Sequence, residues 1–198
     1  MKYTALVPVK SLEIAKSRLA PDLPQIQREK LVLDMLHHVL SVLQDSELFE
    51  RISVVSSDAR VLEQVKVWGA QALIEEQSGH NPALYAAALR EKARGARALL
   101  TISADLPLLS TQEIHNLLKQ SRQYEVVLAP SRDGTGTNAI LVRPPLAVPY
   151  LFGSNSFQRF LEAARQRHLS HTTYDSTGLA FDIDTIDDLR ELEVVSQG

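Results

Sequence analysis

The sequence contains no cysteine among its 198 residues. A chain without thiols can form neither a disulfide nor a thiolate metal site, and it has no thiol nucleophile. The absence is compatible with a reducing compartment such as the cytosol. Three kinds of chemistry are therefore excluded before any motif is considered.

Long apolar runs and blocks of one charge sign are also missing. No apolar stretch approaches the length of a membrane span, and the one near the N-terminus is too short for a signal peptide core. The formal net charge is −3 and the 21 basic residues are scattered, so a surface that neutralises nucleic-acid phosphates is not indicated. We expect a soluble, cytoplasmic protein that binds small molecules and neither nucleic acid nor membrane.

The common signatures of nucleotide-binding and hydrolytic enzymes are missing as well. There is no Walker phosphate loop, no dinucleotide glycine fingerprint and no nucleophile elbow. The six histidines show no metal-ligand spacing. Kinases, dehydrogenases and serine hydrolases of the usual types are therefore disfavoured.

Short β-rich runs alternate with longer stretches of helical period along the whole chain. With 44% hydrophobic residues, the chain can bury a full core, and we expect one domain over residues 1–198. The alternation predicts βαβ units, and hence an α/β fold with a mostly parallel, Rossmann-like sheet. Strands are expected at 3–9, 51–57, 70–76, 96–104, 124–131 and 138–144, and near 171–176 and 179–184. Helices are expected after Pro24, at 59–69 and 81–95, after Ser110, from about Ser156 and after Thr185.

A basic loop follows the first predicted strand. In "VPVKSLEIAKSRLA" the cations Lys10, Lys16 and Arg18 lie close together, with only Glu13 as an acidic neighbour. They would repel one another unless an anion lies between them, and ligands of open parallel sheets bind at this edge. We therefore expect the loop to hold a nucleoside triphosphate. The alternative is an ordinary charged surface.

Carboxylates follow two other predicted strands. Asp105 comes directly after the buried fourth strand, while Asp182 and Asp184 alternate along a predicted strand and so point the same way. Three carboxylates at adjacent strand ends suit Mg²⁺. The alternatives are a turn aspartate at Asp105 and a solvated strand end at Asp182 and Asp184. We expect Asp187 and Asp188 to serve only the dipole of the last helix.

Two further segments could bind anions. Gly134 and Gly136 permit a backbone whose N–H groups converge on an anion, and Thr137 adds a hydroxyl. Gly153 and Ser156 lie at the start of a helix, where free N–H groups favour phosphate or carboxylate. The alternatives are a plain hairpin loop and an ordinary serine N-cap.

Five motifs together resemble a known enzyme family. "PVKSLEIAKSRLA", "SADLPLL", "GTGTNAILVRPP", "FGSNSF" and "LAFDIDTIDDL" are similar, in order and nearly end to end, to guanylyltransferases that activate a three-carbon phospho-acid in the biosynthesis of coenzyme F-420. The resemblance implies a three-layer αβα fold of the nucleotide-diphospho-sugar transferase type. It implies that GTP reacts with 2-phospho-L-lactate or phosphoenolpyruvate, releasing pyrophosphate, with Mg²⁺ as the cofactor.

The resemblance also assigns roles to residues. The implied metal ligands are Asp105, Asp182 and Asp184; the implied catalytic residues are Lys16, Arg18 and Asp105; the implied substrate contacts are Lys10, Asn81, Thr137, Gly153 and Ser156. The sequence departs from the family's usual pattern at two places. Phe160 occupies a position where the family often has histidine, and Asn81 is flanked by His80 and Pro82. Two rival interpretations are a nucleotidyltransferase of the same fold acting on 3-phosphoglycerate, a sugar phosphate or a pterin, and a non-catalytic nucleotide-binding module.

Overall fold

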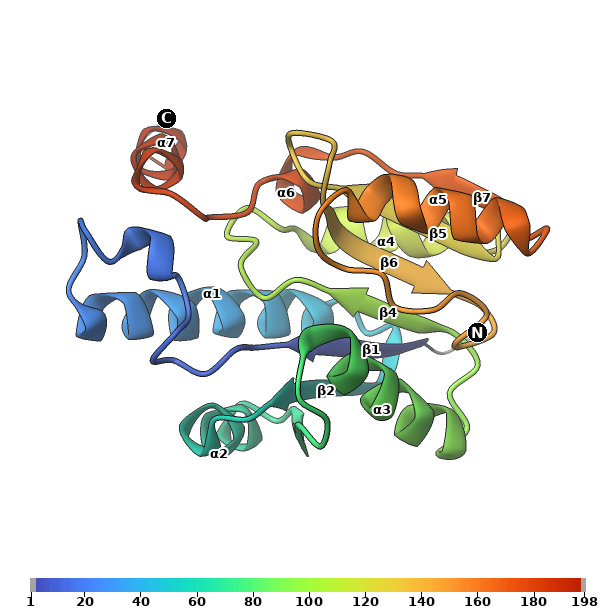
Figure 1. The fold of residues 1–198 in the computed structure, drawn as a ribbon, viewed down its shortest axis with the longest axis horizontal. Helices are drawn as coiled ribbons and strands as arrows, with labels where there is room; N and C mark the ends of the chain where they lie inside the picture. The colour runs from blue at the N-terminus through green and yellow to red at the C-terminus, as the bar shows by residue number, and fades with distance from the viewer. Residues whose placement is uncertain (1–2, 197–198) are drawn as a thin grey trace.

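The computed structural model describes residues 3–196, which form a seven-stranded sheet in the order β3-β2-β1-β4-β6-β5-β7 (Figure 1). The strands are β1 (Tyr3–Pro8), β2 (Phe49–Ser56), β3 (Gln71–Ile74), β4 (Leu99–Ile102), β5 (Val126–Pro130), β6 (Thr137–Val142) and β7 (His171–Thr173). Only β6 runs against its neighbours, pairing antiparallel with β4 and β5, while the other pairs are parallel. The predicted mostly parallel α/β sheet is confirmed. Because β6 is reversed, its first residue lies at the edge where β4 and β5 end.

Most helices begin close to the residues that the sequence predicts. The helices are α1 (Gln25–Asp45), α2 (Ala59–Val67), α3 (His80–Ala93), α4 (Thr111–Gln120), α5 (Ser156–Gln166), α6 (Thr177–Ala180) and α7 (Ile186–Ser196), with a short 3-10 helix, η1, at Ser17–Leu19. Two short helices, α6 and η1, were not predicted. The predicted capping box is present: the Ser110 hydroxyl accepts the Glu113 N–H at 3.3 Å, and the Glu113 carboxylate accepts the Ser110 N–H at 2.9 Å. Such reciprocal bonds satisfy two N–H groups that a helix start leaves free. No helix within residues 3–196 is both long enough and apolar enough to cross a membrane.

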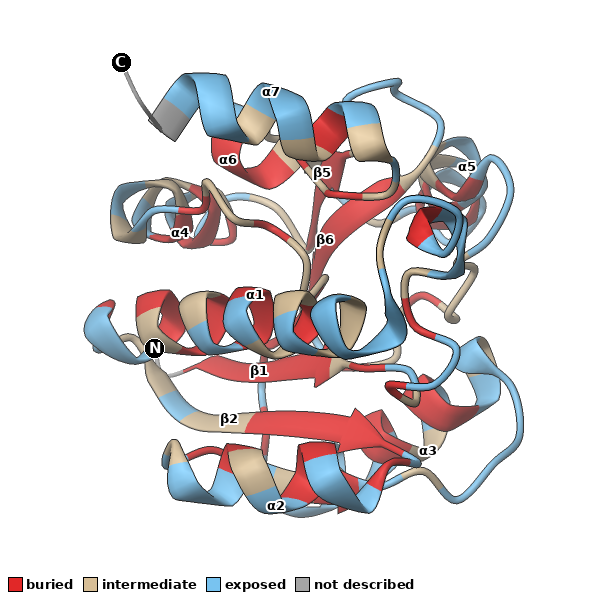
Figure 2. Ribbon diagram, turned by 90° about the vertical axis from the view of Figure 1, so that its left-hand side faces the viewer, coloured by how far each residue is buried: buried red, intermediate tan, exposed pale blue. Residues whose placement is uncertain are grey.

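Helices cover both faces of the sheet, which confirms the three layers. On one face, Ala5 and Val7 of β1 share the main core with apolar residues of α1, α2 and α4. On the other face, Leu6 of β1 clusters with Leu84 of α3, and Phe160 of α5 clusters with the buried residues of β5 and β6. Figure 1 shows α3 and α5 in front of the sheet, and Figure 2 shows β1, β5 and β6 almost wholly buried. Burial on both faces explains why these strands read as continuous apolar runs.

The prediction of a strand over 179–184 is wrong. Leu179 and Ala180 end the short helix α6, and the residues after them are extended but pair with no strand in the described part of the chain. The edge beside β5 is already taken by β7. The segment is held instead by the Asn138 amide, which donates to the carbonyls of Leu179 and Ala180, and by the Ile183 N–H, which donates to the carbonyl of Asp105 at 3.3 Å. An extended backbone preserves the alternation of side chains without a sheet.

Candidate active site

The loop between β1 and α1 carries the predicted basic residues and is anchored from α2. The carboxylate of Asp58 accepts the N–H of Leu12 at 2.9 Å and also caps α2 by accepting the N–H of Arg60 at 3.0 Å. Burial would raise the pKa of Asp58, but the hydrogen bonds from Arg60 and Leu12 outweigh it and lower that pKa. Lys16 adopts a left-handed backbone (φ 55°) at the start of η1. The loop is therefore fixed in a defined conformation at the edge of the sheet.

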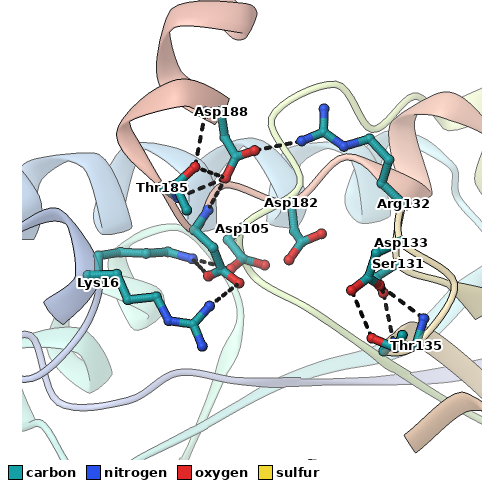
Figure 3. Close-up of polar contacts among 12 residues, drawn as sticks. Lys16, Asp105, Ser131, Arg132, Asp133, Thr135, Asp182, Thr185 and Asp188 are labelled. Atoms are coloured by element: carbon teal, nitrogen blue, oxygen red, sulfur yellow. Dashed lines mark hydrogen bonds and ion pairs between the residues drawn. The ribbon is translucent and has the colours of Figure 1, made fainter. Parts of the chain in front are cut away.

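The side chain of Lys16 is paired with the carboxylates of Asp105 and Asp184. Its Nζ donates to Asp105 and, at 3.2 Å, to Oδ1 of Asp184 (Figure 3). Burial lowers the pKa of Lys16, but the charges of Asp105 and Asp184 raise it overall, so the side chain stays protonated. Arg18 is 75% exposed, and its Nη1 lies 3.9 Å from Oδ2 of Asp184. The predicted need for an anion among these cations is thus met in part by carboxylates from distant parts of the sequence.

The three predicted carboxylates converge. One oxygen from each of Asp105, Asp182 and Asp184 lies within 4.8 Å of the others. Asp105 follows β4, and the other two lie in the extended segment between α6 and α7. The predicted convergence is confirmed, although the segment that carries Asp182 and Asp184 is not a strand.

The charge balance of this cluster fits a divalent cation. Burial raises the pKa of Asp182, and the neighbouring charges of Asp105 and Asp184 raise it further, while a hydrogen bond from Asn138 opposes them. Lys16 brings one positive charge to three carboxylates, so the cluster keeps an excess of negative charge. Mg²⁺ binds carboxylate oxygens in proteins and takes water and phosphate oxygens at its remaining positions.

The sequence pattern did not single out Asn138, which holds the cluster from β6. Its side-chain amide donates to Oδ1 of Asp182 at 3.1 Å and to the carbonyl of Leu179 at 3.0 Å. Asn138 is buried in β6, whose residues are apolar apart from Asn138 and its neighbour Thr137. A lone amide inside such a strand needs hydrogen-bond partners, and this was the signal available in the sequence.

Asp188 has a larger role than serving the helix dipole. Its Oδ2 accepts the backbone N–H groups of Asp184 at 3.0 Å and Thr185 at 2.8 Å, and its Oδ1 accepts from Arg132 at 2.6 Å (Figure 3). Burial would raise the pKa of Asp188, but these hydrogen bonds and the Arg132 charge lower it. The expectation that Asp188 serves only the helix dipole is corrected: it fixes the backbone of Asp184 and joins it to the loop between β5 and β6.

The glycine loop between β5 and β6 is held by its own side chains. Asp133 accepts from the hydroxyls of Ser131 at 2.7 Å and Thr135 at 2.8 Å, and these bonds lower the pKa of Asp133 to about 2. The Gly134 N–H donates to the Ser131 carbonyl, and the Gly136 N–H donates to the Ser131 hydroxyl. The expectation that these two N–H groups converge on an anion is wrong, because both are used within the loop.

The predicted acceptor residues lie together next to this loop. The Ser156 hydroxyl donates to that of Thr137 at 3.2 Å, and both residues are buried. The Ser156 N–H donates to the Gly153 carbonyl at 3.1 Å, and the Phe157 N–H donates to the Thr135 carbonyl at 3.1 Å. The start of α5 therefore offers fewer free N–H groups than the sequence predicts, and the two hydroxyls are its main polar feature.

Two cavities open along this edge of the sheet. The main cavity, of about 340 Å³, is lined by Lys10, Lys16, Arg18, Asp105 and Asp184 among others. A second cavity, of about 220 Å³, shares Lys10 and His80 with it. Burial lowers the pKa of His80, and the charge of Lys10 lowers it further, so the imidazole is neutral at pH 7.

Asn81 lies outside the walls of both cavities. Its side-chain amide donates to the Phe152 carbonyl at 3.0 Å, and its oxygen accepts the Phe152 N–H at 2.9 Å. Phe152 lines the main cavity, and its ring meets that of His80 at 5.3 Å between centroids. Asn81 therefore holds a wall of the main cavity in place, and its contact with substrate stays a prediction.

Comparison with known proteins finds one family that matches nearly the whole chain. Residues 3–198 match a family described as "Guanylyl transferase CofC like". The chain is 42% identical over 192 residues to phosphoenolpyruvate guanylyltransferase from Sphaerobacter thermophilus, covering 97% of this chain and 93% of the relative. It is 36% identical over 199 residues to 2-phospho-L-lactate guanylyltransferase from Methanothermobacter thermautotrophicus, covering 100% and 87%.

Solved structures support the fold. A protein from Desulfovibrio desulfuricans, described as a nucleotide-diphospho-sugar transferase, superposes with a TM-score of 0.84 at 19% identity, covering 100% of this chain and 89% of that one. A CMP:2-keto-3-deoxy-manno-octonic acid synthetase superposes with a TM-score of 0.67 at 14% identity, covering 100% and 99%. At these identities the likeness concerns the fold alone.

Proposed function

Because the chain belongs to the CofC-like guanylyl transferase family, we propose that it transfers GMP from GTP to a three-carbon phospho-acid and releases pyrophosphate. The acceptor is phosphoenolpyruvate or 2-phospho-L-lactate, the substrates named for its relatives. The product serves the biosynthesis of coenzyme F-420. Phosphoenolpyruvate is the favoured acceptor, since the relatives at 42% and 40% identity carry that name.

One observation carries this proposal: the acidic cluster, formed by the carboxylates of Asp105, Asp182 and Asp184, lies between the basic loop and strand β6. Lys16 contacts the cluster from one side, and Asn138, adjacent to Thr137, contacts it from the other. Figure 3 shows Asp105 and Asp182 between Lys16 and the loop that precedes Thr137. GTP would bind on the Lys16 side and the phospho-acid on the Thr137 side, so that the reacting groups meet at the carboxylates.

Asp105, Asp182 and Asp184 would hold Mg²⁺. When bound there, the ion would neutralise negative charge on phosphate oxygens. The role of the three carboxylates is to fix its place at the junction of the two substrate sites. Asn138 and Asp188 keep Asp182 and Asp184 in position.

The transfer itself requires no general base. The phosphate of the acceptor is already largely ionised at pH 7, and one of its oxygens attacks the α-phosphorus of GTP. The new P–O bond forms as the bond to the β-phosphate oxygen breaks, and the electron pair leaves with pyrophosphate.

The basic loop supplies positive charge for the leaving group. Lys10, Lys16 and Arg18 line the main cavity, where they would face the triphosphate and stabilise the charge that develops on pyrophosphate. Lys16 remains protonated because of its two carboxylate partners. Positioning and electrostatic stabilisation thus account for the catalysis that these residues can provide.

Thr137, Gly153 and Ser156 would bind the phospho-acid. A small acceptor with a phosphate and a carboxylate needs donors for two anionic groups, and hydroxyls provide such donors. Phosphoenolpyruvate is planar at its central carbon, whereas 2-phospho-L-lactate is tetrahedral and carries a methyl group. A pocket can distinguish them only by shape, an effect of roughly 1–3 kcal/mol, so modest selectivity is expected.

The proposal is tested by following pyrophosphate release from GTP and Mg²⁺ with one acceptor at a time. Release is expected with phosphoenolpyruvate, less with 2-phospho-L-lactate, and none with 3-phosphoglycerate or a sugar phosphate. Turnover of a sugar phosphate without turnover of either phospho-acid would contradict the proposed acceptor. Lack of turnover with every acceptor, in a protein that binds GTP, would favour a non-catalytic nucleotide-binding role.

A further inference from the structure

The second cavity differs in chemistry from the main cavity that it joins. The main cavity carries three cations of the basic loop. The second is lined by apolar side chains, including Val55, Ala83 and Leu84, and by polar residues that include Glu75 and the shared Lys10. A cavity of about 220 Å³ suits one heterocyclic base, and apolar walls suit the faces of a planar ring.

Glu75 is the acidic residue among those that line the second cavity. Its backbone N–H donates to the Ser56 carbonyl at 3.0 Å, which fixes the main chain at the end of β3. Its half-buried carboxylate makes no hydrogen bond or ion pair with any residue between 3 and 196. The adjacent Glu76, by contrast, is paired with Arg90. A partly desolvated carboxylate without a partner is costly unless a ligand supplies donors.

We infer that Glu75 recognises the guanine base of GTP in the second cavity. Its carboxylate accepts hydrogen bonds from the N1–H and the 2-amino group of guanine, two adjacent donors on one edge of the base. This inference rests on the proposed function, which places the triphosphate in the main cavity. Lys10 and His80 line both cavities, so a nucleotide can extend from one into the other.

The distribution of charge fixes the direction of the nucleotide. The second cavity has one cation, Lys10, beside the carboxylate of Glu75, so its formal charges cancel. The main cavity has three cations beside Asp105 and Asp184, the carboxylates proposed to hold Mg²⁺. The triphosphate is therefore attracted more strongly to the main cavity than to the second. In the reverse orientation the phosphates would face Glu75. The base therefore occupies the second cavity.

The same chemistry predicts an order of nucleotide affinity. Hypoxanthine keeps the N1–H of guanine but lacks the 2-amino group, so ITP loses one hydrogen bond to Glu75. Adenine has an acceptor at N1 and no 2-amino group, so it places a lone pair against the carboxylate. A site built for a donor discriminates strongly against a ligand that lacks it, and the expected order is GTP, then ITP, then ATP.

The test compares Glu75→Gln with Glu76→Gln, which neutralises the neighbouring, already paired carboxylate. Affinities for GTP, ITP and ATP are measured by calorimetry with Mg²⁺ and without any acceptor. The wild-type protein and Glu76→Gln should bind GTP about 10- to 100-fold more tightly than ITP, the effect of one hydrogen bond to a charged group. Glu75→Gln should bind GTP about 10- to 100-fold more weakly than wild type and bring GTP and ITP within about threefold.

A preference for GTP over ITP that survives in Glu75→Gln would overturn the inference, as would a wild-type protein that does not distinguish the two. Because binding is measured without acceptor, these results are independent of guanylyl transfer. If the proposed function fails while the inference holds, the protein will still bind GTP more tightly than ITP but will form no guanylylated phospho-acid. If circular dichroism shows Glu75→Gln to be unfolded, Glu75→Asp replaces it; this variant keeps the charge but retracts it, and unchanged GTP affinity there would also overturn the inference.

Discussion

The carboxylate of Asp188 accepts the backbone N–H of Asp184 at 3.0 Å. The same carboxylate accepts from Arg132, whose guanidinium lies over the Phe181 ring at 4.9 Å from its centroid. A residue of the last helix thus fixes a candidate metal ligand and joins it to the loop before Thr137. Groups that orient ligands in this way typically change metal affinity or activity 10- to 100-fold when removed.

Asp188→Asn should therefore lower the rate of guanylyl transfer by about 10- to 100-fold and raise the Mg²⁺ concentration needed for half-maximal rate. The physical reason is that an amide binds the Asp184 N–H and Arg132 more weakly than a carboxylate does. The matched control is Asp187→Asn, because Asp187 is 83% exposed and pairs only with Arg190 among the described residues. Equal Mg²⁺ dependence in the two variants would show that Asp188 does not position the site.

Arg18→Ala should weaken GTP binding about twofold to fivefold, as expected for an exposed charge, and should make binding less sensitive to salt. Lys30→Ala is the control, since Lys30 and Arg18 are both 75% exposed but Lys30 lies outside the cavity walls. Binding is measured by calorimetry at several salt concentrations. If the two variants behave alike, Arg18 is an ordinary surface residue.

Ser156→Ala should raise the KM for the phospho-acid by about tenfold, the effect of about 1.4 kcal/mol, while changing the KM for GTP little. The reason is that Ser156, whose hydroxyl donates to that of Thr137, is proposed to bind the acceptor and not GTP. Ser154→Ala, at an exposed position of the same loop, is the control. A rise in the KM for GTP alone would show that Ser156 contacts GTP and not the phospho-acid.

Asp133 provides a prediction about pH. Its pKa is about 2 in the folded protein, below the ordinary value of 3.8, because Ser131 and Thr135 donate to the ionised carboxylate. A lowered pKa contributes stability that is present above pH 3.8 and is lost as the pH falls towards 2. The difference in unfolding free energy between wild type and Asp133→Asn should therefore be larger at pH 6 than at pH 2.5. Urea denaturation measures it, and an equal difference at both pH values would contradict the assignment.

Local sequence signals were sufficient for the seven strands of the sheet and for the convergence of the three carboxylates. The apolar run before Asp105 predicted a buried strand, and the end of that strand placed the carboxylate at the ligand edge. The alternation of apolar and acidic residues predicted that Asp182 and Asp184 point to the same side. The prediction is confirmed, although their segment pairs with no described strand. Both inferences depend on neighbours in the chain, and such information is present in the sequence.

The remaining features depend on residues that only the fold brings together. The pairing of Lys16 with Asp105 and Asp184, and the bond from Asn138 to Asp182, join distant segments. Glycine spacing could not show that the loop N–H groups are consumed by Ser131. An unpartnered carboxylate such as Glu75 is recognisable only when its surroundings are known. No local pattern carries this information.

The central claim is that the acidic cluster promotes transfer of GMP with cleavage at the α-phosphorus of GTP. Phosphorus NMR of a reaction containing GTP, Mg²⁺ and phosphoenolpyruvate tests it most directly, with folded Asp105→Asn as the comparison. Wild type should form pyrophosphate and a new unsymmetrical diphosphate in equal amounts, and Asp105→Asn should form them about 10²- to 10³-fold more slowly, a loss typical of removing one transition-state contact. Release of inorganic phosphate and GDP instead, or an undiminished rate in Asp105→Asn, would contradict the account.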